Sequence, residues 1–319
     1  MKLSARETGG SNSRGLDTLS RQRALSKGDL MHKSPIVVFG TGGSGTRVVA
    51  NILAEAGCFI GSNLNRAMDN QDFGFILAGR VDWMRRQFPF NRDVVEDYLR
   101  LFKKVFFHMR LTFADYSLLA KIATEYLYGR SKKSFSRRPL HERARRAVQL
   151  FRPGIMGSSE DFSKYQQWGF KSPEAVYFIE PFVEYFPGVK LIHLVRDGRD
   201  MAVSENRNPL QYLDIFDIDE KDEIKAALVN WCAVNAWARE RCEALIAPEQ
   251  SLLIRYEDIC HQPRKLVDQI LSFAELESTN METIYKIPKP NPTIQRWKKK
   301  REYFQGLDTS VLKNFGYPG

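Results

Sequence analysis

Short apolar runs alternate with helical patterns along most of this 319-residue chain. Residues 36–39 (Ile-Val-Val-Phe) form a continuous β-branched and aromatic run, which is typical of a strand buried on both faces of a sheet. From Thr46 onward, apolar residues recur at helical spacing until Gly57, which can end a helix in the left-handed conformation. The first predicted unit is therefore a strand, a glycine-rich turn and a helix.

The same alternation returns in the second half of the chain. The predicted strands cover about residues 168–171, 190–195 and 252–256, and helices are predicted to start near residues 173, 200 and 263. Strands separated by helices pair in parallel, because each crossover returns the chain to the same edge of the sheet. The pattern predicts an α/β fold with a central parallel sheet, and ligands are expected at the carboxyl ends of its strands.

Two segments do not follow this alternation. Residues from about 80 to 129 show helical periodicity broken by Pro89, which predicts a helical insertion over about residues 80–150. Residues 132–146 form a basic cluster whose usual fate is a solvated loop, with a patch for an acidic acceptor as the alternative.

The first 33 residues are polar, basic and rich in serine and glycine. They lack the apolar core of a signal peptide, and no stretch of the chain is long and apolar enough to cross a bilayer. We therefore expect a disordered basic tail over residues 1–33, one domain over residues 34–319, and a cytoplasmic protein without a transmembrane segment.

Composition adds two constraints. The chain carries 48 Lys and Arg against 38 Asp and Glu, a formal net charge of +10, which favours anionic partners and excludes little by itself. The four cysteines are scattered without a C-x-x-C pair; they are Cys58, Cys232, Cys242 and Cys260. Their spacing favours buried reduced thiols over a metal or redox site.

A glycine-rich turn, residues 40–47 (Gly-Thr-Gly-Gly-Ser-Gly-Thr-Arg), links the first strand to the first helix. Backbone N–H groups and the positive end of the helix can surround an anion there. Gly40, Gly42 and Gly45 also match the dinucleotide pattern G-x-G-x-x-G. The stretch that should then carry a ribose-binding acid, residues 58–63, has none, which disfavours a dinucleotide oxidoreductase.

Interpreted as a Walker loop, the turn has Thr46 where the lysine should be and Arg47 where the Mg²⁺-binding hydroxyl should be. This argues against a magnesium-dependent NTPase or kinase. A third interpretation keeps the phosphate cradle without a metal, because fixed cations and backbone dipoles can stabilise the leaving phosphate of a sulfuryl donor. Ser44, Gly45 and Thr46 then wrap the 5′-phosphate.

A second motif follows the predicted strand at residues 190–195. The turn after this strand presents Arg196, and the next helix carries Ser204. Arg196 can form a forked, charge-assisted contact with a phosphate, and the hydroxyl of Ser204 can donate one more hydrogen bond. His193, inside the strand, is interpreted as a packing histidine rather than a base.

Together, the S-G-T turn at residues 44–46, the R-D-x-R-D motif at residues 196–200 and the following Ser204 resemble the family of sulfotransferases that use 3′-phosphoadenosine-5′-phosphosulfate (PAPS). The similarity covers most of residues 35–317. The resemblance implies a three-layer α/β fold of P-loop NTPase-like topology. It also implies metal-free transfer of a sulfuryl group from PAPS.

The resemblance carries over to individual residues. The implied donor-binding residues are Gly42, Gly43, Ser44, Gly45, Thr46, Arg47, Arg196, Ser204, Arg296, Trp297 and Lys298. Lys171, in F-K-S-P, is similar to the family's K-x-P lysine, which lies close to the transferred group. Gly43 departs from the family, many of whose members carry Arg or Lys there. We expect Arg47 or Lys171 to supply the missing positive charge.

The family presents its base after the first helix, where this chain has Asp69 and Asp72, and Asp72 is preferred. The acceptor is a hydroxyl or amine on a small molecule, carbohydrate, lipid or peptide, and nucleic acid is not expected. A nucleotide kinase-like enzyme and a non-catalytic module that binds the desulfonated product or another nucleotide remain alternatives.

Overall fold

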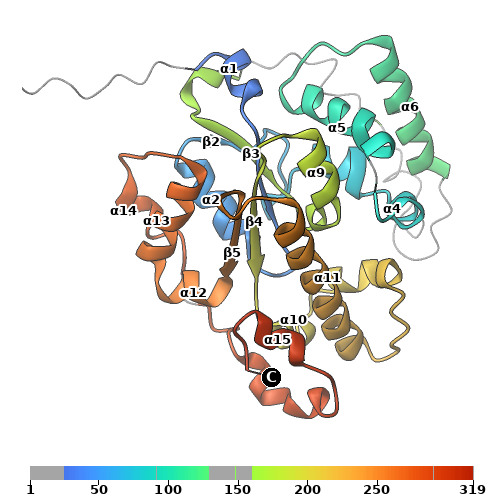
Figure 1. The fold of residues 1–319 in the computed structure, drawn as a ribbon, viewed down its shortest axis with the longest axis vertical. Helices are drawn as coiled ribbons and strands as arrows, with labels where there is room; N and C mark the ends of the chain where they lie inside the picture. The colour runs from blue at the N-terminus through green and yellow to red at the C-terminus, as the bar shows by residue number, and fades with distance from the viewer. Residues whose placement is uncertain (1–24, 91, 129–147, 149–159, 290, 319) are drawn as a thin grey trace, which may run out of the picture.

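The computed structural model describes residues 25–90, 92–128, 148, 160–289 and 291–318 (Figure 1). The strands are β1 (Ile36–Phe39), β2 (Cys58–Phe59), β3 (Gln167–Lys171), β4 (Lys190–Val195) and β5 (Ser251–Arg255). The α-helices are α1 (Lys27–His32), α2 (Thr46–Glu55), α3 (Gln71–Phe73), α4 (Val81–Gln87), α5 (Arg92–Phe106), α6 (Phe113–Tyr128), α9 (Ile179–Tyr185), α10 (Gly198–Ala202), α11 (Glu223–Leu245), α12 (Tyr256–His261), α13 (Pro263–Ala274), α14 (Met281–Ile284) and α15 (Ser310–Asn314). The tighter or wider helical turns are η1 (Gly74–Ala78), η2 (Phe162–Lys164), η3 (Pro173–Phe178), η4 (Asn208–Phe216), η5 (Pro248–Gln250) and η6 (Arg296–Phe304).

The five strands form one parallel sheet in the order β2-β3-β1-β4-β5. β1 lies at its centre, and all four of its residues are buried, as its uninterrupted apolar run predicts. Ile36 pairs with Gly169 on one side and Lys190 on the other. A Cβ on Gly169 would lie 2.3 Å from the backbone oxygen of Ile36, so this strand position requires glycine.

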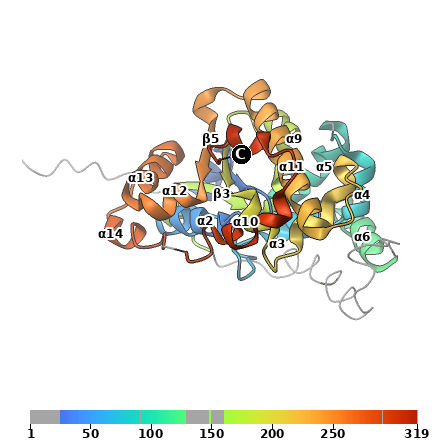
Figure 2. The same cartoon turned by 90° about the horizontal axis from the view of Figure 1, so that it is seen from below.

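Helices cover both faces of the sheet. Ile36 and Val38 point into a core built with α2 and α13, whereas Val37 and Phe39 point into a core built with α9 and α11. Figure 1 shows these two helical layers on opposite sides of the strands, and Figure 2 shows the same separation from below. The predicted three-layer α/β fold with a central parallel sheet is confirmed.

The helical insertion is confirmed for the part of it that is described. Helices α4, α5 and α6 lie together beyond α9 in Figure 1, and α5 packs against α9. Aromatic rings join the insertion to the sheet, since the Phe102 and Phe170 ring centres lie 5.0 Å apart in an edge-on arrangement. The basic cluster at residues 132–146 lies outside the described residues.

Two predicted boundaries need adjustment. The segment predicted as a disordered tail contains α1, whose N-terminus is closed by a capping box between Ser26 and Asp29 and whose Leu30 is fully buried. The helix predicted from Pro173 to Tyr185 is divided into η3 and α9, because Phe178 has a φ of −114° at the junction. Gly57 has a φ of 91°, as its predicted helix-ending role requires.

The predicted burial of the cysteines is confirmed for three of the four. Cys58, Cys242 and Cys260 are buried, Cys232 is partly buried, and all four are free thiols. Burial raises the pKa of the Cys242 thiol to about 11. Among the described residues, no group of three or more His, Cys, Asp and Glu side chains is arranged to hold a metal ion. No helix in the described ranges is both long and apolar enough to span a membrane.

Side chains buried at the centre of the sheet should contribute most to the free energy of unfolding. Leu191 on β4 is fully buried, whereas Leu253 on β5 is 42% exposed. Leu191→Ala should lower the free energy of unfolding by about 2–5 kcal/mol, because it removes buried methyl groups and leaves a cavity. Leu253→Ala, the matched control, should change it by less than about 0.5–1 kcal/mol. Urea unfolding midpoints measure both, and equal losses would contradict the assigned core.

Candidate functional site

The glycine-rich turn leaves β1 and enters α2 at the edge of the sheet where the strands end. A Cβ on Gly40 would lie 2.2 Å from the backbone oxygen of Leu194, and one on Gly45 would lie 2.3 Å from the Tyr256 ring. Gly45 also has a φ of 93°, in the region that favours glycine. The turn is glycine-rich because β4 and the residue after β5 press against it.

The hydroxyl of Ser44 is a buried polar group at the start of α2. Ser44 has no exposed surface, and its Oγ has no hydrogen-bond partner within the described residues. Leaving such a group unpaired costs about 1–3 kcal/mol. The first N–H groups of α2 receive no side-chain cap, since the N-cap residue is Gly45. These donors together suit an anion.

Gly42, Gly43 and Arg47 complete the turn. Gly43 has a φ of 101°, and a Cβ there would lie 3.2 Å from Nδ2 of Asn206, so a side chain at this position would be strained. This is a physical reason why position 43 carries no Arg or Lys, although many members of the resembled family have one there. A Cβ on Gly42 would lie 3.0 Å from Cβ of Asn208, so the turn also contacts η4. Arg47, in the first turn of α2, is exposed.

The structure brings Lys171 and Asp69 together. Lys171 ends β3 and is 3% exposed; its ammonium pairs with the carboxylate of Asp69 and donates to the backbone oxygen of Ala67 at 3.1 Å. The backbone N–H of Asn70 donates to the backbone oxygen of Lys171 at 2.8 Å, which ties the same two segments. The lysine is therefore held against the segment after β2, where a buried charge needs a partner.

Asp72 lies in α3, a few residues beyond Asp69, and is buried. Nδ2 of Asn63 donates a hydrogen bond of 2.7 Å to Oδ1 of Asp72. Burial raises the pKa of Asp72 to about 6, although the bond from Asn63 acts in the opposite direction. A carboxyl group with such a pKa can exchange a proton near neutral pH, a property that a general base needs.

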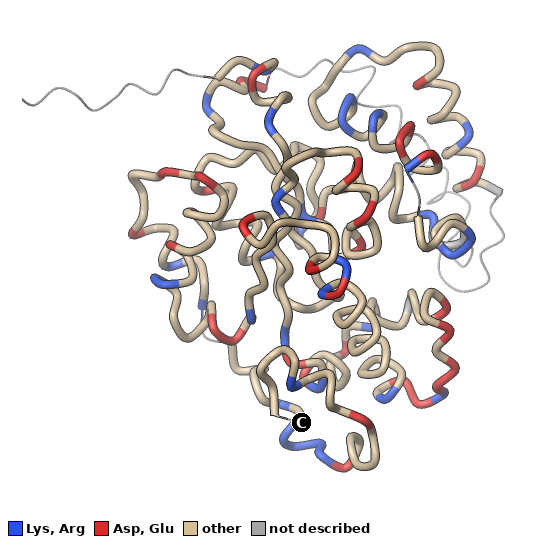
Figure 3. Tube along the Cα trace, viewed as in Figure 1, with Lys and Arg blue, Asp and Glu red and all other residues tan. Residues whose placement is uncertain are grey.

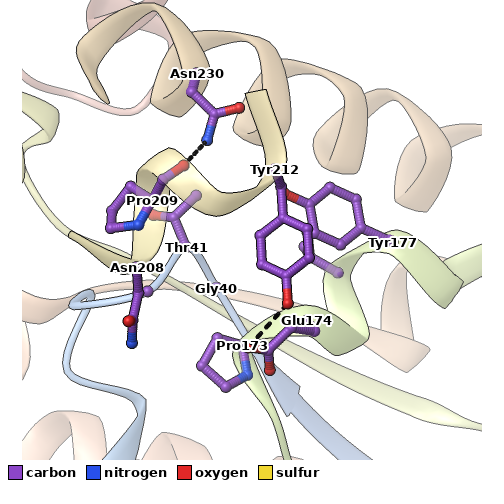
Figure 4. A pocket seen from close by; sticks show the side chains of 11 residues that line it. Gly40, Thr41, Pro173, Glu174, Tyr177, Asn208, Pro209, Tyr212 and Asn230 are labelled. Atoms are coloured by element: carbon purple, nitrogen blue, oxygen red, sulfur yellow. Dashed lines mark hydrogen bonds between the residues drawn. The ribbon is translucent and has the colours of Figure 1, made fainter. Parts of the chain in front are cut away.

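Glu174 is a site residue that sequence reasoning missed. Ser172 Oγ donates to its Oε2 at 2.7 Å. The Tyr212 hydroxyl donates to its Oε1 at 3.5 Å (Figure 4). Burial raises the pKa of Glu174, and the negative charge of Asp69 raises it further. The signal that points to Glu174 is its position three residues after Lys171, at the carboxyl end of a parallel strand.

An open pocket lies between the glycine-rich turn and the helical segments η3 and η4 (Figure 4). The backbone of residues 40–42 lines one side, and Glu174, Tyr177 and Tyr212 line another. The cavity measures about 20 Å³, room for about one water molecule, and it opens to solvent. Asn230 on α11 also lines it, and the buried Oδ1 of Asn230 has no hydrogen-bond partner in the described part of the chain.

Arg196 follows β4 and lies beside the glycine-rich turn. Its NH2 group donates to the backbone oxygen of Thr293 at 3.0 Å and to Oγ1 of Thr293 at 2.6 Å. The guanidinium carbon lies 5.0 Å from the centre of the Tyr256 ring, and the same ring borders Gly45. The Nε of Arg196 is buried and has no hydrogen-bond partner among the described residues. The two sequence motifs therefore meet across Tyr256.

The next residues of the second motif form hydrogen bonds within the protein. Asp197 accepts two hydrogen bonds from the guanidinium of Arg199, at 3.0 and 2.8 Å. Ser204 lies just after α10, where its Oγ accepts a 3.2 Å hydrogen bond from the backbone N–H of Asn206. Accepting that bond leaves the hydroxyl proton of Ser204 able to serve a ligand.

Asp200 attaches the C-terminal segment to this motif. Its carboxylate accepts hydrogen bonds from the backbone N–H groups of Gln295, at 2.7 Å, and Trp297, at 3.0 Å. Nε of Arg296 donates to the backbone oxygen of Asp200 at 2.8 Å. The guanidinium carbon of Arg199 lies 3.7 Å from the Trp297 ring centre, a close cation–π contact.

Positive charge gathers at this edge of the molecule. Burial lowers the pKa of Arg296, and the nearby charge of Arg196 lowers it further. Lys298 is exposed and donates to Oε1 of Gln295 at 2.7 Å. Figure 3 shows the basic run of η6 at the bottom of the molecule, next to the C-terminus. Arg196 and Arg296 therefore bring two positive charges close together, an arrangement that suits an anion.

Comparison with known proteins identifies the class. Residues 35–280 match the model described as the Sulfotransferase family, and this range is most of the chain. The chain therefore belongs to the sulfotransferase family, and the resemblance noted from its motifs is confirmed at that level. A search of curated protein sequences finds no match.

Solved sulfotransferase structures are similar to this chain at low sequence identity. Sulfotransferase STF9 from Mycobacterium avium is 14% identical with a TM-score of 0.41, over 86% of this chain and 77% of that one. The sulfotransferase domain of the Synechococcus PCC 7002 olefin synthase is 14% identical with a TM-score of 0.44, over 90% and 97%. The sulfotransferase domain of the curacin biosynthetic pathway is 14% identical with a TM-score of 0.42, over 82% and 80%.

The bonds of Asp200 generate a prediction for the C-terminal segment. Asp200→Ala removes the acceptor of two backbone N–H groups, and a hydrogen bond to a charged group contributes about 1.5–3 kcal/mol. Hydrogen exchange at Gln295 and Trp297 should therefore accelerate by about 10- to 100-fold. Asp219→Ala, at an exposed site between η4 and α11, is the control. Unchanged exchange in the Asp200 variant would show that another contact holds the segment.

Proposed function

We propose that this sulfotransferase-family chain transfers a sulfuryl group from PAPS to a hydroxyl or amine by in-line displacement, without a metal. The observation that carries the proposal is the unpaired, fully buried Oγ of Ser44 at the uncapped start of α2. A phosphate oxygen at this point would pair the hydroxyl and the helix N–H groups at once. Arg196 adds a fixed positive charge across Tyr256.

The donor phosphates have separate proposed sites. Residues 42–47 wrap the 5′-phosphosulfate, and Arg196 with Ser204 binds the 3′-phosphate. Arg196 now donates to Thr293, so the 3′-phosphate would take over or share these donors. The C-terminal residues Arg296, Trp297 and Lys298 cover the donor, which their attachment through Asp200 supports.

Charge stabilisation is proposed for Lys171 and Arg47. As the bond from sulfur to the 5′-phosphate breaks, negative charge grows on the departing oxygen, and a positioned cation lowers the barrier. Lys171 is buried at the carboxyl end of β3, so its charge acts in a poorly solvated region. Gly43 supplies no charge, and Arg47 lies further along the first turn of α2.

Asp69 and Asp72 are the proposed bases that the family resemblance supplies. Asp69 is engaged by Lys171, and Asp72 is engaged by Asn63. Either carboxylate therefore has to share or leave its present partner before it can take the proton of an acceptor. Because Asp69 pairs with Lys171, Asp69 also has a second proposed role, which is to hold the ammonium of Lys171 in place.

The same residues bear on the two alternative functions, a kinase-like enzyme and a non-catalytic module. A nucleotide kinase-like enzyme would need a loop lysine where Thr46 stands. A non-catalytic module that binds the desulfonated product, adenosine 3′,5′-bisphosphate (PAP), is favoured by the missing cation at Gly43. Free, scattered thiols suit a reducing compartment, and we propose a cytoplasmic location on that ground.

Binding of PAP tests the donor site. Without magnesium, PAP at a hundred times its dissociation constant should stabilise the fold by about 2.7 kcal/mol, seen as a rise in melting temperature. Arg196→Ala should reduce this rise, because the proposed 3′-phosphate contact is lost. Arg264→Ala removes an exposed arginine that pairs with Glu282 and should leave the rise unchanged. No stabilisation of the unaltered protein at saturating PAP would reject the proposed donor.

Turnover tests the role of Lys171. Lys171→Ala should lower kcat by about 10²–10³-fold while PAP binding persists, because the proposed interaction strengthens as charge develops on the leaving phosphate. Lys121→Ala, on the exposed face of α6, is the matched control and should keep full activity. Full turnover by a folded Lys171→Ala protein would exclude the lysine from the reaction.

A further inference from the structure

The segment that follows α10 lies against the first half of the glycine-rich turn. The hydroxyl of Thr41 donates to the sulfur of Met201 at 3.6 Å. A Cβ on Gly42 would lie 3.0 Å from Cβ of Asn208. Residues 201–208 therefore border the turn at both ends of the segment, and the side chains between those ends can reach a ligand that the turn holds.

Asn206 is the residue of this segment whose side chain approaches Gly43. A Cβ on Gly43 would lie 3.2 Å from Nδ2 of Asn206, the nearest atom on that side of the turn. Because Gly43 has no side chain, the space beside this amide is left open. An oxygen placed there would lie within hydrogen-bond distance of Nδ2, about 2.7–3.2 Å.

Two hydrogen bonds fix the orientation of Asn206. Its Oδ1 accepts from the backbone N–H of Asn208 at 3.0 Å, and its own backbone N–H donates to Oγ of Ser204 at 3.2 Å. Since Oδ1 is engaged, the two N–H bonds of the amide remain as its donors. No residue in the described part of the chain accepts a hydrogen bond from Nδ2.

A second side-chain donor without a partner lies on the turn itself. Ser44 has no exposed surface, and its Oγ has no hydrogen-bond partner among the residues that the structure describes. Ser44 and Asn206 come from segments far apart in the sequence, yet both lie at Gly43. A phosphate or sulfate group has several oxygens, so one such group can accept from both side chains and from the start of α2.

We infer that Asn206 binds the 5′-phosphosulfate of the donor, and that its Nδ2 donates a hydrogen bond to an oxygen of this group. The inference rests on the proposed function, since it takes PAPS as the donor and residues 42–47 as the cradle of its 5′-end. Asn206 then connects the two donor phosphates. Its side chain binds the 5′-group, and its backbone N–H orients Ser204, which is assigned to the 3′-phosphate.

Gly43 and Asn206 are complementary in this arrangement. A side chain at position 43 would enter the space that the ligand oxygen is to occupy, 3.2 Å from Nδ2. The amide is neutral, so its contribution is a directed hydrogen bond to an anion rather than a full positive charge. A hydrogen bond to a charged group is stronger than one between neutral groups, and its loss weakens binding by about 10- to 100-fold.

The experiment measures the dissociation constants of PAP and of adenosine 3′-monophosphate for the full chain, by titration calorimetry with competition against PAP for the weaker ligand. The two ligands differ only in the 5′-phosphate, so the ratio of their dissociation constants reports the binding of that group. Asn206→Ala should weaken PAP by about 10- to 100-fold and adenosine 3′-monophosphate by less than about threefold.

Asn206→Asp is the second variant. It keeps an oxygen that can accept from the N–H of Asn208, but it places a carboxylate where Nδ2 stands. Repulsion between this carboxylate and the 5′-phosphate should weaken PAP more than Asn206→Ala does. Melting temperatures of both variants without ligand check that they are folded.

Two further variants frame the result. Asn314→Ala, at an exposed position of α15, should leave both dissociation constants unchanged. Ser204→Ala should weaken both ligands, because both carry the 3′-phosphate. The inference is overturned if Asn206→Ala binds PAP as the unaltered protein does, or if it weakens the two ligands equally, which would mean that Asn206 only supports Ser204. Failure of the unaltered protein to bind PAP would reject the proposed function itself.

Discussion

The close approach of the glycine-rich turn to the end of β4 and to Tyr256 is the constraint on which the site depends. A Cβ on Gly40 or Gly45 would lie 2.2 or 2.3 Å from a neighbouring atom, so the turn can lie here only without side chains at those positions. This contact sets the direction of α2 and buries Ser44. It also puts Tyr256 between the turn and Arg196, so the two motifs lie on either side of one ring.

Hydrogen bonds to neighbouring residues position the charged groups of the site. Asp200 holds the C-terminal segment by two backbone N–H groups, and this positions Arg296 where burial and the charge of Arg196 lower its pKa. Part of the chain's surplus of positive charge, +10 in total, therefore lies beside the glycine-rich turn. The two guanidinium groups are kept together by hydrogen bonds, from Arg196 to Thr293 and from Arg296 to the backbone oxygen of Asp200.

Much of the fold could be predicted from local patterns. The continuous apolar run of β1, the helical spacing after Thr46 and the left-handed Gly57 appear in the structure as expected, because each reflects a short-range backbone or burial preference. Helix α1 was missed, since its stability comes from burying Leu30 against a distant core rather than from a long periodic pattern. The break between η3 and α9 was missed for a similar reason, because packing around Phe178 overrides the helical pattern.

The candidate site likewise combines residues that the sequence predicts with contacts that only the structure shows. The sequence by itself determined the glycine-rich turn, Arg196 and Lys171, because their spacing relative to strand ends is short-range information. Only the tertiary structure decided which carboxylate faces which partner: Asp69 meets Lys171 from 102 positions away, and Glu174 meets Tyr212 from 38 positions away. Such contacts depend on strand order and on the packing of helices against the sheet, which a local pattern of residues does not encode.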